Sequence, residues 1–181
     1  MGNTLFDRYA EAFLELCIED KTIDLASYRD EVLTLKSVFK YEKEFIKFLS
    51  SYNIDYDDKI LVLDKVLKGF SKNTTNYVKL IVQKNRGFFL YEIFKATLNE
   101  LNTYLKVEVG KVYSTTPLSE ENMNKIINAL SKKKNKIIEL TNVVDPSIIG
   151  GIKVVLNNDI YDSSVSSKVE RMKNLISKEI D

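Results

Sequence analysis

The residues that could do chemistry in this chain are few, and their spacing argues against the common catalytic arrangements. The sequence has no histidine and one cysteine, Cys17. It therefore lacks the usual general base, and neither an internal disulfide nor a cysteine metal cluster can form. Asp55, Asp57 and Asp58 lie close together but lack the glycine and terminal glutamate of a calcium loop. We interpret them as the acidic start of a helix, and we expect no catalytic residue, no metal site and no cofactor.

The pair Gly150-Gly151 raises the question of a phosphate-binding loop. Such a loop follows a strand and leads into the N-terminus of a helix. Gly150-Gly151 instead precedes the strand-like segment 152–156. We expect these glycines to permit a positive φ or a close approach of two backbone segments.

The strongest run of charge is Lys132–Lys136, near the predicted end of a helix. As an RNA-binding patch it would need neighbouring aromatic residues for stacking, and none lies beside it. Lysines at a helix end interact favourably with the free carbonyl groups there, which is the interpretation that we favour. The alternative function is that of an RNA- or ribosome-associated two-domain binding protein that uses Lys132–Lys136. Charges also interrupt every apolar run before the roughly 18 residues that a membrane span needs.

These residues lie in two regions that differ in their predicted secondary structure. Residues 1–105 have three glycines and no proline, and their apolar spacing predicts helices over 4–20, 22–39, 41–50, 55–68, 72–85 and 87–105. Residues 106–181 combine valine-rich strands, with Gly110 as a candidate β-bulge, with helices near 117–132 and 163–179. We predict an α+β fold, in which a six-helix N-terminal bundle precedes a small C-terminal α/β module with a β-hairpin and two helices.

Three of the predicted helices carry informative apolar faces. The apolar arc of helices 4–20 and 72–85 is roughly 200° wide, against about 140° for helix 22–39. Either the two wide-arc helices are surrounded by their own domain, or part of each arc lines a groove for a partner helix. The last helix has an apolar stripe, most of which we expect to cover the sheet. That stripe consists of Val165, Val169, Met172, Leu175 and Ile176.

Residues 144–173 resemble the C-terminal signature of the delta subunit family of rotary ATP synthases, which includes the mitochondrial oligomycin sensitivity-conferring protein. The matching residues are Asp145, Pro146, Gly150, Gly151, Asp162 and Ser164. Near the front of the chain, the stretches Arg8-Tyr9-Ala10 and Asn76-Tyr77-Val78 look like parts of the family's first and fifth helices. The turns at 157–159 and 162–164 depart from the usual family pattern, but neither change removes a reactive group.

This resemblance implies a non-catalytic stator subunit that links the catalytic head to the peripheral stalk, so that rotation drives ATP synthesis. Residues 1–105 would bind the N-terminal helix of an alpha subunit, and residues 106–181 would contact the membrane-anchored b subunits. The chain would bind no nucleic acid and would reach the cytoplasmic face of a bacterial cell membrane only through its partners. The expected alpha-subunit site comprises Leu5, Tyr9, Ala12, Phe13, Leu16, Tyr77, Val78, Ile81 and Val82. Changing Tyr9 or Val78 to aspartate should then weaken this binding while the free domain stays folded.

Overall fold

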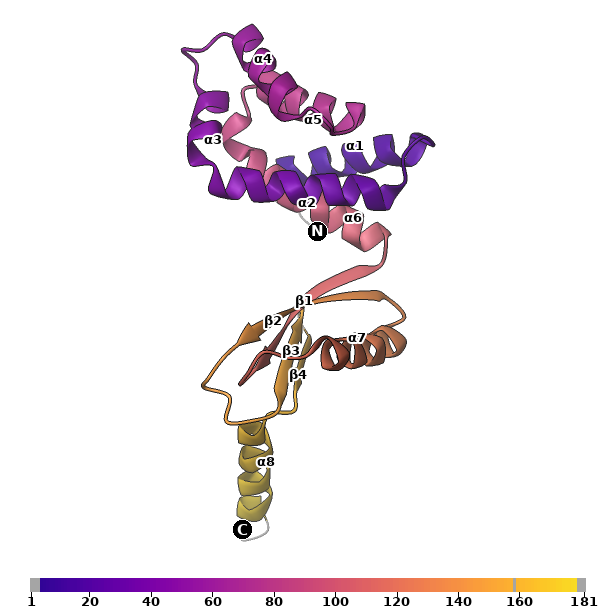
Figure 1. Cartoon of the computed structure of the whole chain (residues 1–181), viewed down its shortest axis with the longest axis vertical. Helices are drawn as coiled ribbons and strands as arrows, with labels where there is room; N and C mark the ends of the chain where they lie inside the picture. The colour runs from indigo at the N-terminus through magenta and orange to yellow at the C-terminus, as the bar shows by residue number, and fades with distance from the viewer. Residues whose placement is uncertain (1–3, 158, 179–181) are drawn as a thin grey trace. The chain divides into compact units, whose positions relative to one another are not determined.

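The computed structural model describes residues 4–157 and 159–178, with side chains described as far as Met172. The chain divides into two compact units, Met1–Leu105 and Lys106–Asp181 (Figure 1). The first unit is helical throughout. Its elements are α1 (Leu5–Glu19), α2 (Leu25–Tyr41), α3 (Lys43–Ser50), α4 (Tyr56–Val66), α5 (Lys72–Gln83), the 3₁₀ helix η1 (Gly87–Phe89) and α6 (Leu90–Tyr104).

Capping side chains mark where α1, α2 and α5 begin. Thr4 and Asp7 form a reciprocal capping box at α1, which satisfies backbone N–H groups that have no partner within the helix. Ser71 caps α5, and the Glu31 carboxylate from α2 accepts hydrogen bonds of 2.7 Å from both the Ser71 N–H and the Ser71 hydroxyl. The start of α5 is therefore fixed to α2. Asp55 occupies the N-cap of α4 as the sequence predicted, although its side chain makes no capping hydrogen bond.

An aromatic cluster joins four helices in the core of the first unit. The ring of Phe13 on α1 stacks on Tyr77 of α5 with centroids 4.4 Å apart. Tyr77 contacts Phe94 on α6 at 5.5 Å, and Phe94 meets Phe39 on α2 edge-on at 5.1 Å. These rings use much of the apolar arc of α1 and α5 inside the unit itself.

The second unit is a four-stranded sheet with one helix packed on it. Its elements are β1 (Val107–Ser114), α7 (Glu120–Lys134), β2 (Ile137–Val144), β3 (Ile152–Leu156), β4 (Asp159–Asp162) and α8 (Val165–Lys178). The strand order is β2-β1-β3-β4, where β1 pairs with β2 in parallel and the other pairs are antiparallel. Because parallel strands need a crossover connection, α7 links β1 to β2. Leu130 of α7 is buried with Val112, Ile138 and Val154 of the sheet.

The predicted fold class is wrong in its helix count and in its sheet. The described residues contain eight α-helices, the 3₁₀ helix η1 and a four-stranded mixed sheet, in an α+β arrangement. Residues 87–105 do not form one continuous helix, because η1 precedes α6 and brings the helical segments of the first unit to seven. A Cβ on Gly87 would lie 2.9 Å from the backbone of Leu49, so this turn is packed directly against α3. The C-terminal module is likewise more than one hairpin, since β1 pairs with a strand on each side.

Two glycines of the sheet are explained by close backbone packing. Gly151 has a φ of +82°, and a Cβ there would lie 2.6 Å from the carbonyl oxygen of Ser163. The expectation for the Gly150-Gly151 pair is thus confirmed at Gly151; Gly150 has no positive φ, and a Cβ there would meet only the Val165 side chain, at 3.2 Å. Gly110, by contrast, is not a bulge: it stays in register with Leu140 and Leu156. A Cβ on Gly110 would lie 2.4 Å from the carbonyl oxygen of Val155, which is why a glycine is needed.

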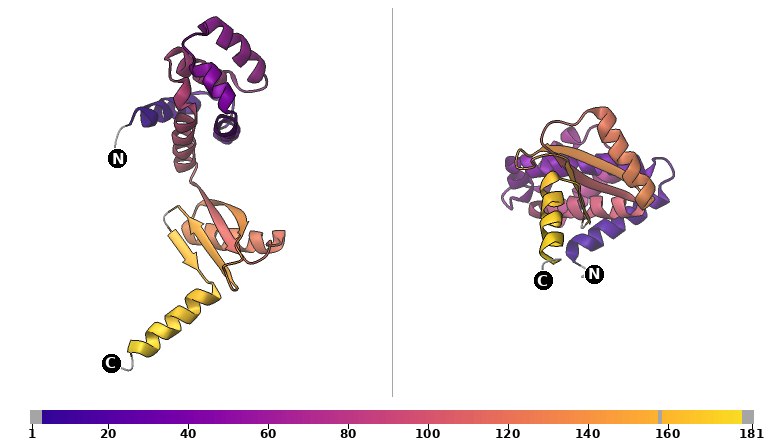
Figure 2. Two further views of the ribbon diagram at one scale, coloured as in Figure 1. Left: turned by 90° about the vertical axis from the view of Figure 1, so that its left-hand side faces the viewer. Right: turned by 90° about the horizontal axis from the view of Figure 1, so that it is seen from below.

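The expectation that α8 covers the sheet is also wrong for its described side chains. Val165, Val169 and Met172 are all exposed and lie outside the buried cluster beneath α7. Leu175 and Ile176 lie outside the described side chains. Figure 2 shows α7 beside the sheet and α8 continuing away from its end. Among the described side chains, the sheet therefore buries its core under α7, and Val165, Val169 and Met172 of α8 stay exposed.

Candidate functional site

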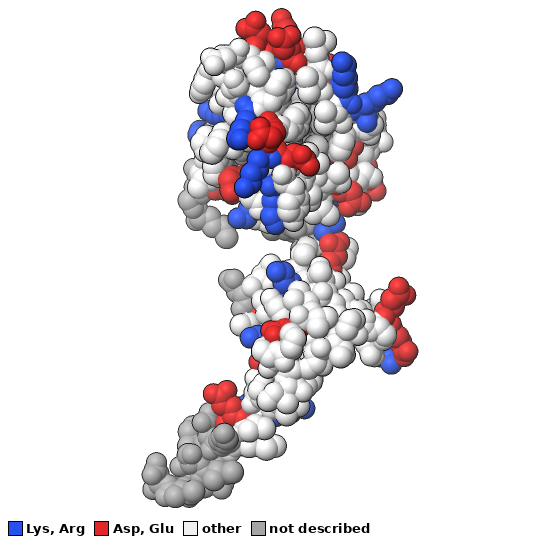
Figure 3. All heavy atoms as spheres, turned by 60° about the vertical axis from the view of Figure 1, so that its left-hand side comes forward, with Lys and Arg blue, Asp and Glu red and all other residues white. Residues whose placement is uncertain are grey.

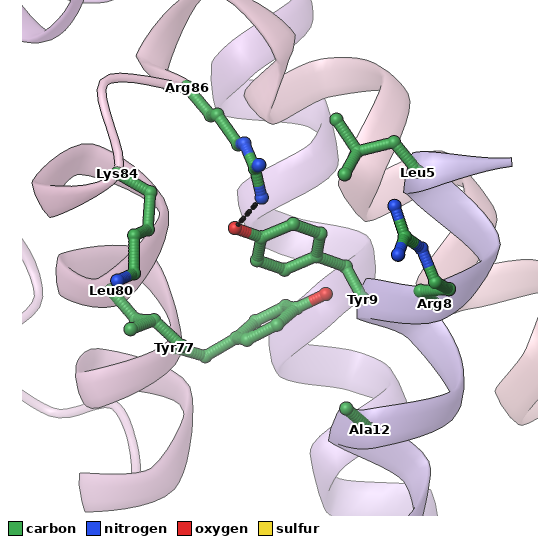
Figure 4. Close-up of a pocket in the computed structure, with 8 residues that line it drawn as sticks. All are labelled: Leu5, Arg8, Tyr9, Ala12, Tyr77, Leu80, Lys84 and Arg86. Atoms are coloured by element: carbon green, nitrogen blue, oxygen red, sulfur yellow. Dashed lines mark hydrogen bonds between the residues drawn. The ribbon is translucent and has the colours of Figure 1, made fainter.

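An open groove of about 340 Å³ lies between α1 and α5 in the first unit (Figure 4). Helix α1 contributes Leu5, Arg8, Tyr9 and Ala12, and α5 with the turn that follows it contributes Tyr77, Leu80, Lys84 and Arg86. We call this hollow the α1–α5 groove. Ala12 and Leu80 are exposed there, and Leu5 and Tyr9 are half-buried. Apolar side chains are thus accessible along both helices.

Two tyrosines lie side by side between the helices. The ring centroids of Tyr9 and Tyr77 are 6.3 Å apart, and the Tyr77 hydroxyl lies 2.9 Å from the hydroxyl of Thr97 on α6. Burial raises the pKa of Tyr77 well above its ordinary value, so its hydroxyl stays protonated and can donate to Thr97. The phenol is therefore held in place by the core and presents little of itself to solvent.

Three cations surround one end of the α1–α5 groove. Arg86 donates a hydrogen bond to the Tyr9 hydroxyl, and its guanidinium carbon lies 5.1 Å from the centre of the Tyr9 ring (Figure 4). In the part of the chain that the structure describes, Arg8, Lys84 and Arg86 make no ion pair with an acidic side chain. The groove thus combines accessible apolar positions with uncompensated positive charge, which suits an amphipathic segment that carries acidic residues.

The structure divides the nine residues expected at the alpha-subunit site into two groups. Leu5, Tyr9, Ala12 and Tyr77 line the α1–α5 groove, and Leu16 is exposed one turn beyond Ala12. The other four are buried in the unit's own core. These are Phe13, Val78, Ile81 and Val82.

Four groove residues were not expected from the sequence. Arg8, Lys84 and Arg86 were passed over because charged residues carry no periodic apolar signal. Leu80 lies on the apolar arc of α5, but the sequence gives no sign that it is exposed while its neighbours Val78 and Ile81 are buried. One side of each wide arc is therefore core, and the other side borders the groove; that a partner helix fills the groove stays a prediction.

Three of the six signature residues of the second unit, Asp145, Asp162 and Ser164, line a polar cavity of about 290 Å³. The Asp145 carboxylate accepts a hydrogen bond from the Ser147 N–H, and the Asp162 carboxylate accepts one from the Ser164 N–H. Hydrogen bonds from Ser164 and Ser167 lower the pKa of Asp162 to about 2. Ser164 is buried, and its hydroxyl accepts from the Ser167 N–H at the start of α8. These residues, together with Pro146 and the glycine pair, shape the turns that lead into β3 and α8.

The lysine run is engaged within its own unit. The ammonium of Lys134 contacts Glu108 at 2.8 Å and Asp159 at 2.5 Å, and Lys136 contacts Glu108 at 2.6 Å. The Lys133 ammonium lies 4.5 Å from the centre of the Tyr161 ring. Lys132, Lys133 and Lys134 form the last turn of α7, so the predicted placement at a helix end is confirmed. Lysines that pair with acids nearby do not favour an RNA-binding patch.

The described residues provide neither a metal site nor a membrane-spanning helix. No group of three or more acidic or cysteine side chains there could hold a metal ion. No helix in the described ranges is both long and apolar enough to span a bilayer. Cys17 is buried, and its burial raises the thiol pKa to about 12, so it packs as a small apolar side chain.

Comparisons with known proteins point to one family. The family model described as ATP synthase delta (OSCP) subunit matches residues 5–176. The chain is 31% identical over 181 residues to ATP synthase subunit delta of Clostridioides difficile, with 99% of each chain covered. It is 32% identical over 172 residues to ATP synthase subunit delta of Bacillus cytotoxicus, with 94% of each covered. A chain in the Toxoplasma gondii mitochondrial ATP synthase hexamer has the same fold, with a TM-score of 0.69 at 20% identity, and 96% of this chain and 98% of that chain are covered.

Proposed function

We propose, from the premise that this chain belongs to the ATP synthase delta (OSCP) subunit family, that its α1–α5 groove holds the N-terminal helix of an alpha subunit. Members of this family are non-catalytic stator components of the rotary ATP synthase. The match therefore confirms both the family and the stator role that the sequence predicted. The chain accordingly works in association with other ATP synthase subunits, and it is peripheral to the membrane part of the complex.

The observation that carries this proposal is the open, partly apolar groove bordered by three cations that form no ion pair with an acidic side chain of the described residues. An amphipathic helix binds such a groove by burying one apolar face, and its acidic residues complement the cations at the rim. Few apolar positions are accessible here, so a single groove gives moderate affinity once the cost of association is subtracted. A second attachment elsewhere on the chain raises the overall affinity, because a tethered contact acts at high effective concentration.

We propose that this second attachment is made by the second unit to the b subunits at the cytoplasmic face of the membrane. The exposed apolar stripe of α8 supports this, since Val165, Val169 and Met172 have no cover within the sheet core. A stator must resist torque, and two attachments on two units of one chain allow it to connect the head to the stalk. The stripe would be tested by Val169→Asp, which should weaken binding to a purified b-subunit fragment without lowering the melting temperature.

The groove is tested with a synthetic peptide from the N-terminus of the alpha subunit. Leu80→Asp should abolish detectable peptide binding, because the carboxylate replaces an apolar anchor and must be desolvated. Leu61→Asp is the matched control: Leu61 lies on α4, is 61% exposed and does not line the groove. Circular dichroism would check that both variants are folded. Equal loss of binding in the two variants, or normal binding by Leu80→Asp, would remove the groove as the site.

A further inference from the structure

A second hollow of about 390 Å³ lies on the first unit, between α2, α3, η1 and α6. Its apolar lining consists of Phe39, Ile46, Phe88 and Tyr91. Phe88 is 71% exposed, whereas Phe39 belongs to the core. We call this hollow the lysine-lined pocket, because its remaining lining residues are all lysines. It shares no residue with the α1–α5 groove, so it is a separate surface.

The lining lysines are Lys40, Lys43 and Lys47, and only one of them is neutralised. Lys47 pairs with Glu44 at 2.6 Å, and Lys40 lies 5.1 Å from the centre of the exposed Tyr41 ring. Lys43 makes no ion pair within the described ranges. Figure 3 shows Lys and Arg side chains gathered over this part of the helical unit, with a few acidic ones between them.

Positive charge also accumulates beside the pocket. Lys36 lies one turn before Lys40 on α2, and its pKa is lowered first by burial and then by the nearby cations Lys40, Lys95 and Arg29. Lowering of a lysine pKa by other cations means that the folded chain carries repulsion at this face. A partner that brings carboxylates would relieve that repulsion and would be steered to the face by its field.

The apolar part of the pocket could accommodate an apolar side chain of a partner protein. An exposed phenylalanine beside an open apolar hollow is the arrangement in which one inserted side chain buries the most area, and aromatic residues are enriched at such interface centres. Lysines around the hollow match the polar, charged rim that surrounds a buried interface core. Because the chain belongs to a family of ATP synthase subunits, the partner that we consider for this face is a segment of another subunit whose carboxylates would complement the lysines.

We infer that the lysine-lined pocket is a second docking site of the helical unit, occupied by an acidic segment of another ATP synthase subunit that inserts an apolar side chain beside Phe88. The inference rests on family membership and on the chemistry of the pocket. It does not depend on what fills the α1–α5 groove.

Photo-crosslinking in the assembled ATP synthase tests the occupant. Phe88 is replaced by a photoreactive phenylalanine analogue, and Tyr52, which is 84% exposed on the loop after α3 and does not line this pocket, receives the same replacement as the control. We expect a crosslink from position 88, stronger than from position 52, to a segment of a subunit with net negative charge. A crosslink no stronger than the control, or one to a neutral or basic segment, to a second copy of this chain or to lipid, overturns the inference.

Binding of the full-length chain to ATP synthase stripped of this subunit tests the energetics. Phe88→Ala should weaken binding roughly tenfold, and Lys43→Glu roughly threefold at low salt with a smaller effect at high salt. Lys21→Glu, the same charge change at an exposed site in the α1–α2 loop, is the matched control. Phe88→Ala should leave binding of the alpha-derived peptide unchanged. If Lys43→Glu binds the stripped complex as tightly as Lys21→Glu does, or if Phe88→Ala has no effect on this binding, the pocket is not a docking site. If Phe88→Ala instead loses binding of the alpha-derived peptide, the pocket is part of the first site and the inference of a second site is wrong.

Discussion

The sharpest prediction compares two positions on α5 that lie two residues apart. Val78 is fully buried at 0% exposure, and Leu80 is 44% exposed and lines the α1–α5 groove. Truncating each to alanine should therefore separate stability from binding. Val78→Ala should lower the stability of the helical unit and spare peptide binding, whereas Leu80→Ala should mainly weaken peptide binding.

The magnitudes follow from these exposures. Complete burial of a leucine side chain contributes about 1.5–3 kcal/mol, so the 44% still exposed at Leu80 represents about 0.7–1.3 kcal/mol, or a three- to tenfold rise in Kd. The part already buried makes Leu80→Ala cost the free unit about 1 kcal/mol. Val78→Ala removes two methyl groups from the core and leaves a cavity, which costs about 2–3 kcal/mol and lowers the melting temperature by roughly 10–20 °C.

The assay is fluorescence anisotropy of a labelled peptide from the alpha-subunit N-terminus, titrated well below the melting temperature of either variant. Circular dichroism gives the melting temperature of each. The reasoning is refuted if folded Val78→Ala loses as much affinity as Leu80→Ala, or if Leu80→Ala binds as tightly as the unmodified chain. The comparison also replaces the expectation for Val78→Asp, since a carboxylate at a fully buried position would unfold the unit rather than report on binding.

Two further predictions concern the second unit. Hydrogen bonds from Lys134 and Lys136 lower the pKa of Glu108. The stabilisation that these bonds provide is therefore present above the ordinary carboxyl pKa and is lost as the pH falls through the lowered pKa. Between about pH 6 and pH 3, the melting temperature should fall further for the unmodified chain than for Glu108→Gln. Gly110→Ala should destabilise the sheet by about 1–3 kcal/mol, because its Cβ would lie 2.4 Å from the Val155 carbonyl oxygen and 2.5 Å from Leu156 Cδ2. Denaturant titration would measure this against Lys111→Ala, an exposed change on the same strand, and equal midpoints for the two variants would contradict the packing argument.

The sequence by itself determined the local elements and the family. Apolar periodicity located the helical segments of the first unit to within a few residues, and capping residues such as Ser71 and Ser119 stand where the structure begins helices. The sequence also indicated a position of special backbone geometry at Gly151. A glycine is needed there because φ is positive and the backbone of Ser163 lies close. The signature around Asp145, Gly150 and Asp162 predicted the ATP synthase delta subunit family, which the family match confirmed.

Tertiary structure alone decided which apolar residues are core and which are available to a partner. Periodicity places Val78 and Leu80 on the same broad arc, but it does not report what lies beyond each side of a helix. Only the packing of the helical unit places Val78 in its core cluster, and only the open groove beside α1 leaves Leu80 exposed. The same holds for the described part of α8, where Val165, Val169 and Met172 are exposed because α7 covers the core of the sheet. The role of the lysine run likewise could not be predicted from the sequence. The fold brings Glu108 and Asp159 close to Lys134, and charges pair through space and not along the sequence.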